Sequence, residues 1–170
     1  MLLVTGGAGF IGSNLIAELN ASGRSDIVVN DTLGVGDKWR NIAKRQFADL
    51  LPPRELMDWL DGRKLEAVLH LGAISDTTAS DGDLVVETNF RLSMRLLDWC
   101  TSSRTPFIYA SSAATYGNGE AGFEDDWSPE SLQRFITVSS SIRAIPISPL
   151  RDFTWSSSAK LSTVDCHCAS

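Results

Sequence analysis

The sequence predicts an α/β protein built on a doubly wound parallel sheet of about five strands. Three observations support this prediction. Short apolar runs alternate with helix-length amphipathic segments, the first run (residues 1–4) leads directly into the glycine-rich segment 5–12, and an acidic residue, Asp31, follows the second run. Strands that alternate with helices are typical of a parallel sheet covered by helices on both faces.

The glycine-rich segment has the spacing of a turn that binds phosphate groups. Gly6, Gly9 and Gly12 follow one another at intervals of three residues. In such a turn the first glycine allows a tight bend, the second lets a pyrophosphate approach the backbone, and the third lets the next helix lie close to the sheet. Glycine triplets also occur in turns that bind nothing, but Asp31 lies about 20 residues further on, where a carboxylate accepts hydrogen bonds from an adenosine ribose. We therefore predict a Rossmann-type dinucleotide site.

Length and charge restrict the other classes of function. The chain has 170 residues, a hydrophobic fraction of 43% and a net charge of −6, as expected for one folded domain. An acidic protein is a poor partner for nucleic acid or for an anionic membrane. The apolar N-terminus has no basic region before it and no run is long enough to span a membrane, so we expect a cytoplasmic protein. The three cysteines do not form a disulfide framework, and the segment 166–168 lacks the second ligand pair of a metal site.

The first half of the chain gives three strands and two helices. A helix is expected from Gly12 to about Ser22, ended by Gly23, and a second strand at 26–30. The glycines of 33–39 predict a loop, in which Lys38 is either close to the ribose or an ordinary surface lysine. A third strand is expected at 46–50, with Asp49 at its carboxyl end, followed by a short helix at 54–60.

The second half continues the alternation. A fourth strand is expected at 67–71, and the small residues of the loop 72–78 would let a flat ring or a phosphate approach the backbone. His70 has two possible roles, that of a catalytic acid or base and that of a structural residue of this strand. We favour the structural interpretation. A long helix is expected at 83–100, whose broad apolar face is either buried in the monomer or forms a homo-oligomer contact. A fifth strand at 106–110 leads into the hydroxyl-rich segment 111–117, at the expected catalytic edge.

Two of these segments carry a resemblance to a known family. The turn 5–12 and the segment 109–117, Tyr-Ala-Ser-Ser-Ala-Ala-Thr-Tyr-Gly, resemble those of the extended short-chain dehydrogenase/reductases. Within them, residues 1–134 are most similar to the ADP-glycero-manno-heptose 6-epimerases, including the segments 37–41, 72–75 and 88–90. The resemblance implies bound NADP or NAD and an isomerase of lipopolysaccharide biosynthesis. Its substrate would be an ADP-sugar, oxidised to a ketone and reduced again with inversion at C6.

The resemblance also implies roles for individual residues. Those near the cofactor are Phe10 and Ile11 at the pyrophosphate, Asp31, Thr32 and Lys38 at the adenosine ribose, Asp49 and Leu50 at the adenine, and Leu71, Gly72, Ala73, Ile74 and Ser75 at the nicotinamide. Asn89 would hold the last loop against the helix behind it, and Ser112 would be the catalytic hydroxyl. Family members often carry a second lysine where this chain has Pro53, so NADP and NAD both stay open.

The chain departs from the family after residue 134. The family's Tyr-x-x-x-Lys pair, which supplies the acid and base, is absent, because Tyr116 is followed four positions later by Glu120. We therefore expect an inactive chain, with a dinucleotide-binding domain at 1–134 that stops before the substrate-binding part. Residues 135–170 are serine-rich and without periodicity, as in an out-of-frame or disordered tail, and the alternative is a real divergent element. The edge of the fifth strand would then be uncovered.

Two further functions stay open at this point. The chain could be a non-catalytic dinucleotide-binding module, or a different nucleotide-sugar epimerase or dehydratase. Binding of a cofactor without turnover of any ADP-sugar would favour the module.

Overall fold

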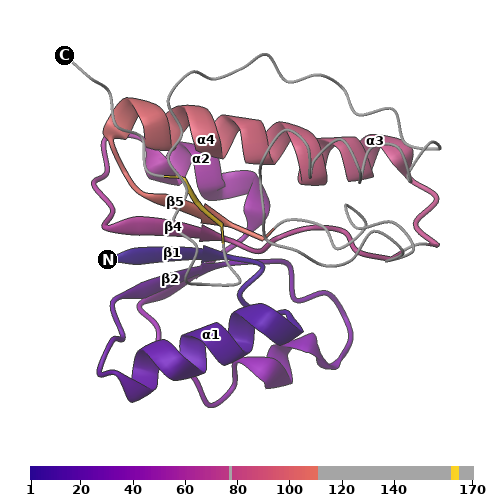
Figure 1. Cartoon of the computed structure of the whole chain (residues 1–170). Helices are drawn as coiled ribbons and strands as arrows, with labels where there is room; N and C mark the ends of the chain where they lie inside the picture. The colour runs from indigo at the N-terminus through magenta and orange to yellow at the C-terminus, as the bar shows by residue number, and fades with distance from the viewer. Residues whose placement is uncertain (77, 111–161, 165–170) are drawn as a thin grey trace, which may run out of the picture.

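The computed structural model describes residues 1–76, 78–110 and 162–164, and these form a six-stranded sheet with helices on both faces (Figure 1). The sheet order is β3-β2-β1-β4-β5-β6. The strands are β1 (Leu2–Thr5), β2 (Ile27–Asn30), β3 (Asp49–Leu51), β4 (Ala67–His70), β5 (Phe107–Tyr109) and β6 (Ser162–Val164). The first five pair in parallel and β6 pairs antiparallel with β5. This confirms the predicted doubly wound α/β fold.

The strand β1 lies at the centre of the sheet, where the strand order reverses. Leu3 pairs with Val28 of β2 on one side and with Val68 of β4 on the other. The chain therefore builds outward in one direction through β2 and β3, and in the opposite direction through β4 and β5. A crevice forms outside the carboxyl ends of the strands at such a reversal, and ligands of open α/β sheets bind there.

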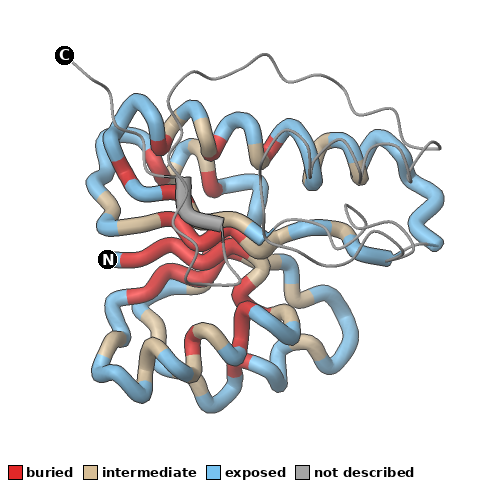
Figure 2. The backbone as a smooth tube through the Cα atoms, viewed as in Figure 1, coloured by how far each residue is buried: buried red, intermediate tan, exposed pale blue. Residues whose placement is uncertain are grey.

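Alternate residues of the central strands form two separate hydrophobic cores. Leu3, Val28 and Val68 belong to one cluster, and their neighbours along the strands, such as Val4 and Leu69, belong to the other. Successive side chains of a strand point to opposite faces, so burial of both sets requires a layer on each face. Figure 2 shows the result as a buried central sheet between helices that are exposed on their outer sides.

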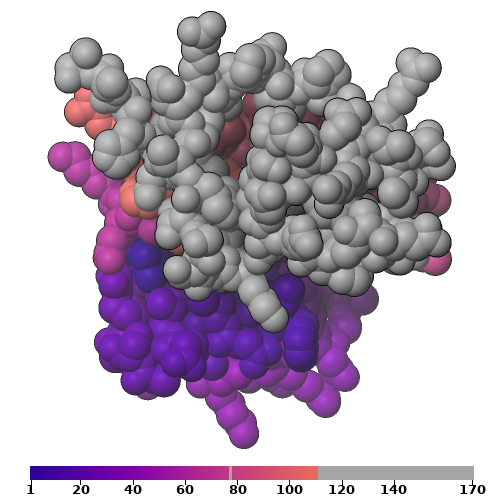
Figure 3. Space-filling model, in the orientation of Figure 1, coloured from indigo at the N-terminus to yellow at the C-terminus, as the bar shows by residue number. Residues whose placement is uncertain are grey.

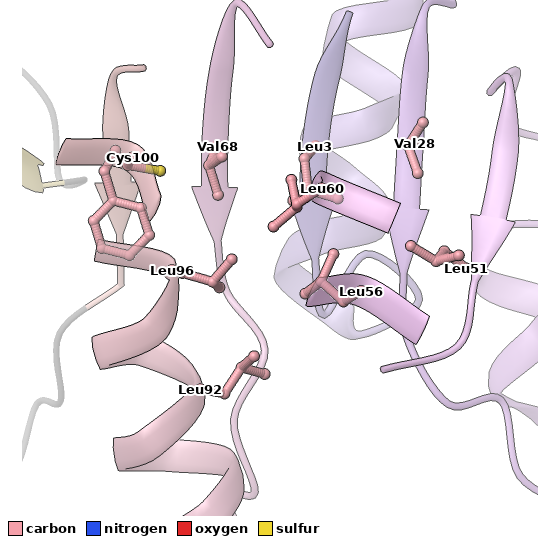
Figure 4. Close-up of a cluster of buried hydrophobic side chains, with 10 residues drawn as sticks. Leu3, Val28, Leu51, Leu56, Leu60, Val68, Leu92, Leu96 and Cys100 are labelled. Atoms are coloured by element: carbon pink, nitrogen blue, oxygen red, sulfur yellow. The ribbon is translucent and has the colours of Figure 1, made fainter. Parts of the chain in front are cut away.

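The helices supply these two layers. The helix α1 (Phe10–Ala21) lies on one face and α2 (Leu56–Leu60) and α4 (Leu92–Ser103) lie on the other (Figure 1). In the space-filling view, α1 and the other N-terminal segments form the lower part of the molecule (Figure 3). Leu92 and Leu96 point from α4 towards the strand that carries Val68 (Figure 4).

The long helix predicted at 83–100 is confirmed, but it is not a regular α-helix. It consists of α3 (Gly82–Val86), a π-helical segment (Glu87–Arg91) and α4. The side chain of Asp81 caps its start by accepting a hydrogen bond from the amide of Leu84. A π-helical segment widens one turn of a helix, and such segments are frequent at functional sites.

Three local predictions need correction. The helix α1 begins at Phe10, two residues before the expected Gly12, with Gly9 as its N-cap. The loop expected at 33–39 runs into a 3-10 helix, Asp37–Asn41. The third strand is shifted towards the C-terminus, so Asp49 begins β3 and does not end it. Leu51, which is buried and pairs with Asn30, ends this strand before Pro52.

The strand β6 was not expected from the sequence. It pairs with β5 over Phe107–Tyr109, so this edge of β5 is covered, contrary to the uncovered edge that we inferred. The proposed boundary at residues 134 and 135, like the rest of the tail, lies outside the described residues.

Candidate functional site

The glycine turn between β1 and α1 is fixed by close backbone contacts. Gly6 has φ +66, and a Cβ on it would lie 2.7 Å from the backbone of Gly72. A Cβ on Gly12 would lie 2.3 Å from the carbonyl oxygen of Gly6. Gly9 is different, since a Cβ there would meet only the oxygen of Gly6, at 3.1 Å. The fold thus excludes side chains at Gly6 and Gly12, whereas a Cβ on the half-buried Gly9 would make one tight contact, with the carbonyl oxygen of Gly6.

The start of α1 is suited to an anion. Its first turn carries no acidic side chain, and Gly9 caps it without a side-chain hydrogen bond. The first amide groups of a helix have no intrahelical acceptor, and the helix dipole is positive at this end. Phe10 and Ile11 are exposed at 83% and 61%, although both are large and apolar. Their side chains lie beside the amides that a phosphate group would use.

Asp31 connects the turn to the end of β2. Its side chain is only 8% exposed, and Oδ2 accepts a hydrogen bond of 2.9 Å from the amide of Ala8. Its Oδ1 accepts from the amide of Thr32 at 2.7 Å and from Nζ of Lys38 at 2.5 Å. Lys38 also donates to the carbonyl of Thr32. The structure therefore brings together the three residues assigned to the ribose, beside the glycine turn.

A further contact to the turn was not predicted. The side-chain amide of Asn41 donates to the carbonyl of Ala8 at 2.8 Å and ties the 3-10 helix to the turn. Asn41 lies in the segment 37–41 that resembles the family, which was the only sequence signal for it.

Asp49 and Leu50, the residues assigned to the adenine, lie on β3. Asp49 is exposed and accepts a hydrogen bond from the amide of Leu50, which is half-buried. Because Asp49 begins β3, it lies two residues short of the strand's carboxyl end.

The loop that follows β4 is held from two sides. Gly72 lies against Gly6, and its amide donates to Oγ1 of Thr5 at 3.0 Å. Asn89 brackets Ile74, because its Oδ1 accepts from the Ile74 amide at 2.7 Å and its Nδ2 donates to the Ile74 carbonyl at 2.9 Å. Ala73 and Ser75 are exposed, whereas Leu71, Gly72 and Ile74 are half-buried. This geometry is the one expected of Asn89 as the residue that holds the loop to the helix.

His70 is buried at the end of β4. Its Nδ1 lies 2.6 Å from Oγ1 of Thr5, its Nε2 lies 2.8 Å from Oγ of Ser93, and its ring stacks on Phe107. Burial lowers the pKa of His70 to about 4, so the ring is neutral near pH 7. These contacts agree with the structural interpretation of this residue.

Other expected site features lie elsewhere. Ser112 and Tyr116 lie outside the described residues, as does the segment 166–168. Among the residues that the structure describes, no three histidine, cysteine or acidic side chains gather as metal ligands. In the same part of the chain, no helix is both long and apolar enough to span a membrane.

The carboxyl edge of the sheet thus combines a glycine turn, a helix N-terminus and a buried carboxylate. Comparison with known proteins gives a consistent result. Residues 2–134 match the model of the NAD dependent epimerase/dehydratase family. An ADP-L-glycero-D-manno-heptose-6-epimerase of Fusobacterium nucleatum is 44% identical over 142 residues, which are 81% of this chain and 43% of that protein.

Solved structures show the same likeness. The ADP-L-glycero-D-manno-heptose-6-epimerase of Helicobacter pylori superposes with a TM-score of 0.63 at 28% identity, covering 82% of this chain and 49% of the other. The UDP-glucuronic acid 4-epimerase of Bacillus cereus, solved in complex with NAD, gives 0.57 at 26% identity, covering 81% and 51%. The chain therefore spans about half the length of these solved structures and less than half of its curated relative.

Proposed function

Because the chain belongs to the NAD-dependent epimerase/dehydratase family, we propose that it binds an adenine dinucleotide, NAD or NADP, at the carboxyl edge of its sheet. The observation that carries the proposal is the glycine turn. Gly6 and Gly12 are held by contacts that exclude a side chain, and the half-buried Gly9 between them is the N-cap of α1 and carries no side chain of its own. That is the arrangement a pyrophosphate needs. Residues 1–134 would form the dinucleotide-binding domain.

We assign the individual contacts from this geometry together with the resemblance. The amides at the start of α1 bind the pyrophosphate, with Phe10 and Ile11 beside it. Asp31, Thr32 and Lys38 bind the adenosine ribose, and Asp49 and Leu50 lie towards the adenine. The loop 71–75, held by Asn89, would hold the nicotinamide. A bound nicotinamide would supply hydride transfer, and the protein's residues would orient the ring and exclude water.

The reaction we propose for the intact family arrangement is inversion at C6 of an ADP-heptose, as the names of the two heptose epimerases described above suggest. The chain's own residues would then hold the cofactor, and Ser112 would contact the sugar hydroxyl. Within these 170 residues, however, neither Tyr109 nor Tyr116 is followed four positions later by a lysine. General acid and base groups are typically worth about 10²–10⁴ in rate, so we propose that this chain binds the cofactor without measurable epimerisation.

The binding proposal is tested by replacing Gly9 with valine and measuring NAD and NADP affinity by calorimetry. Gly82→Val is the matched control, because a Cβ at Gly82 meets no atom within 4 Å and the residue lies on α3, away from the turn. We expect Gly9→Val to remain folded and to lose binding, with affinity unchanged in Gly82→Val. Wild-type affinity in Gly9→Val would remove the glycine turn from the site.

The catalytic proposal is tested by a single-turnover assay with the ADP-heptose and the wild-type chain loaded with NADP. We expect stoichiometric cofactor and no inversion at C6, the outcome of a non-catalytic module. Inversion would show that a residue other than the family's tyrosine acts as the base. Turnover of a different nucleotide sugar would instead favour a related epimerase or dehydratase.

We also propose that the long helix contacts a second copy of the chain. Four large apolar residues on it are more than a third exposed, namely Leu84, Val86, Phe90 and Met94. Exposed apolar surface of this kind is typical of helix-to-helix contacts. Sedimentation of wild type and of Phe90→Glu tests this contact. We expect wild type to sediment as an oligomer and Phe90→Glu as a monomer, and a monomer in both samples would contradict the proposal.

A further inference from the structure

Hydrogen bonds connect the glycine turn, the loop 71–75 and the long helix through one buried histidine. Oγ1 of Thr5 lies 2.6 Å from Nδ1 of His70, and Nε2 of His70 lies 2.8 Å from Oγ of Ser93. Thr5 and His70 are only 1% and 5% exposed. These residues come from β1, β4 and α4, so the contacts join three elements that are distant in sequence.

The Asn89 end of this series fixes the direction of the other hydrogen bonds in it. At one end, the amide of Gly72 can only donate, and it donates to Oγ1 of Thr5 at 3.0 Å. At the other end, the carbonyl of Asn89 can only accept, and it accepts from Oγ of Ser93 at 3.0 Å. The hydroxyl proton of Ser93 is thereby used, so Ser93 must accept from Nε2 of His70.

His70 is therefore confined to one neutral tautomer. Its Nε2 carries the proton, and its bare Nδ1 accepts the hydroxyl proton of Thr5. With the opposite tautomer, a bare Nε2 would face the oxygen of Ser93, whose proton is already donated to Asn89, and the hydroxyl proton of Thr5 would lose Nδ1 as its acceptor. Stacking of the ring on Phe107, with centroids 5.8 Å apart, holds it in the plane that makes both contacts.

Both ends of the series act on the same loop. The Gly72 amide is the donor at one end, and Gly72 also lies against Gly6 of the glycine turn. The carbonyl at the other end belongs to Asn89, whose side chain brackets Ile74 with hydrogen bonds of 2.7 and 2.9 Å. A shift of the loop at Gly72 or at Ile74 therefore disturbs the same set of contacts.

We propose that Thr5, His70 and Ser93 are positioning residues, which hold the loop 71–75 in its cofactor-binding form through a directed series of hydrogen bonds with a single histidine tautomer. This inference rests on the proposed function for the part that concerns the cofactor. These residues touch the loop and the helix and act on a bound dinucleotide only through them. An ordered loop raises the apparent affinity, because affinity falls with the fraction of molecules in the competent form.

The tautomer is tested on the cofactor-free chain by nitrogen-15 NMR of labelled histidine. The chain has two histidines, and His70→Gln identifies the signals of His70 by removing them. We expect a proton-bearing Nε2 and a bare Nδ1 near pH 7. The opposite tautomer, or a mixture of both, would overturn the directed series.

The positioning role is tested with Thr5→Val, which keeps the shape of the side chain and removes its hydroxyl, and with Ser93→Ala. Thr105→Val is the matched control, since Thr105 is a buried threonine too, 5% exposed, and its hydroxyl is hydrogen-bonded to that of Ser103 at the opposite end of the sheet. We expect amide exchange at Gly72 to rise by about five- to tenfold in Thr5→Val, the loss of one net hydrogen bond. Thr5→Ser should restore the wild-type rate.

Ser93→Ala separates positioning from general stability. Ser93→Ala should give a mixture of His70 tautomers and faster amide exchange at Gly72, although Ser93 does not touch Gly72. NADP affinity should fall by up to about tenfold in both Thr5→Val and Ser93→Ala. Exchange and affinity equal to those of Thr105→Val would overturn the proposal. Wild type that fails to bind NADP would overturn the proposed function, whereas the tautomer and exchange results would still decide the positioning role.

Discussion

Asp31 and Lys38 form an ion pair at the position assigned to the adenosine ribose. The carboxylate is 8% exposed and the lysine 39%, with Nζ of Lys38 2.5 Å from Oδ1 of Asp31. A carboxylate suits the free 2′-hydroxyl of NAD and repels the 2′-phosphate of NADP, unless a cation lies beside it. Lys38 is that cation, so the pair is compatible with both cofactors.

Lys38→Ala should therefore weaken the binding of NADP more than the binding of NAD. A hydrogen bond to a charged group contributes about 1.5–3 kcal/mol, so we expect NADP affinity to fall by at least about tenfold with little change for NAD. Lys64→Ala, which removes an exposed lysine at the other end of the sheet, controls for the change in net charge. Equal losses for the two cofactors, measured by calorimetry, would show that Lys38 does not contact the 2′-phosphate.

His70 should make stability depend on pH near neutrality. Its pKa in the folded chain is about 4, because burial disfavours the charged ring, whereas an unfolded histidine has a pKa of about 6.5. The unfolded chain thus binds a proton that the folded chain does not, so stability is complete above about pH 6.5 and is lost as the pH falls towards 4. Urea unfolding should show a loss of about 2 kcal/mol between about pH 7.5 and 5.

The control for this pH dependence is His70→Gln. This variant should flatten the slope of stability against pH, whatever its effect on stability at pH 7. Hydrogen bonds from Arg24 lower the pKa of Asp26 and Glu66. Protonation of these two carboxylates therefore reduces the stability of the fold only at lower pH. A slope that persists in His70→Gln would contradict a neutral, buried His70.

The sequence indicated residues whose role depends on a local pattern, and it missed those whose role depends on folding. Gly6, Gly12 and Asp31 follow from spacing, and the structure brings them together. Thr5 and Ser93 have no such pattern, because their partner His70 lies 65 and 23 residues away. Only the pairing of β1 with β4 and the packing of α4 against them make these contacts visible.

At the scale of elements, α4 is held to the sheet by a narrow set of buried side chains. Leu96 is fully buried in the core cluster with Leu92 and Phe107, whereas Asp98 on the same helix is exposed. Leu96→Ala should lower the free energy of unfolding by about 2–5 kcal/mol, through lost burial and a residual cavity. Asp98→Ala, the control on α4, should change it by less than about 0.5 kcal/mol in urea unfolding. Equal losses in the two variants would place the buried face elsewhere.

Strand positions were predictable where both faces of the strand are buried. Continuous apolar runs give β1, β2 and β4 to within one residue of their ends. β3 was misplaced because it is an outer strand of the sheet that mixes exposed and buried positions, so Asp49 was assigned to the wrong end. The strand β6 has no signal in the periodicity, since it depends on pairing with the distant strand β5.

At the scale of the whole molecule, the sheet order explains why the site lies where it does. The alternation of strands and helices predicted a parallel sheet, but the order β3-β2-β1-β4-β5 comes from long-range pairing. That order brings the segments after β1, β2 and β4 to one crevice. The glycine turn thus lies beside both Asp31 and Gly72. The Ala8 amide donates to Asp31, and the Gly72 amide donates to Thr5.

A titration of the nitrogen-15-labelled chain with NADP, followed by amide NMR, tests the location of this site most directly. We predict that the signals that shift belong to three segments at one edge of the sheet, residues 6–12, 31–38 and 71–75. The amides of Arg24, Asp26 and Glu66, at the opposite edge, should stay unchanged and serve as internal controls. Shifts confined to that opposite edge, or no shifts at saturating NADP and NAD, would contradict a dinucleotide site at the glycine turn.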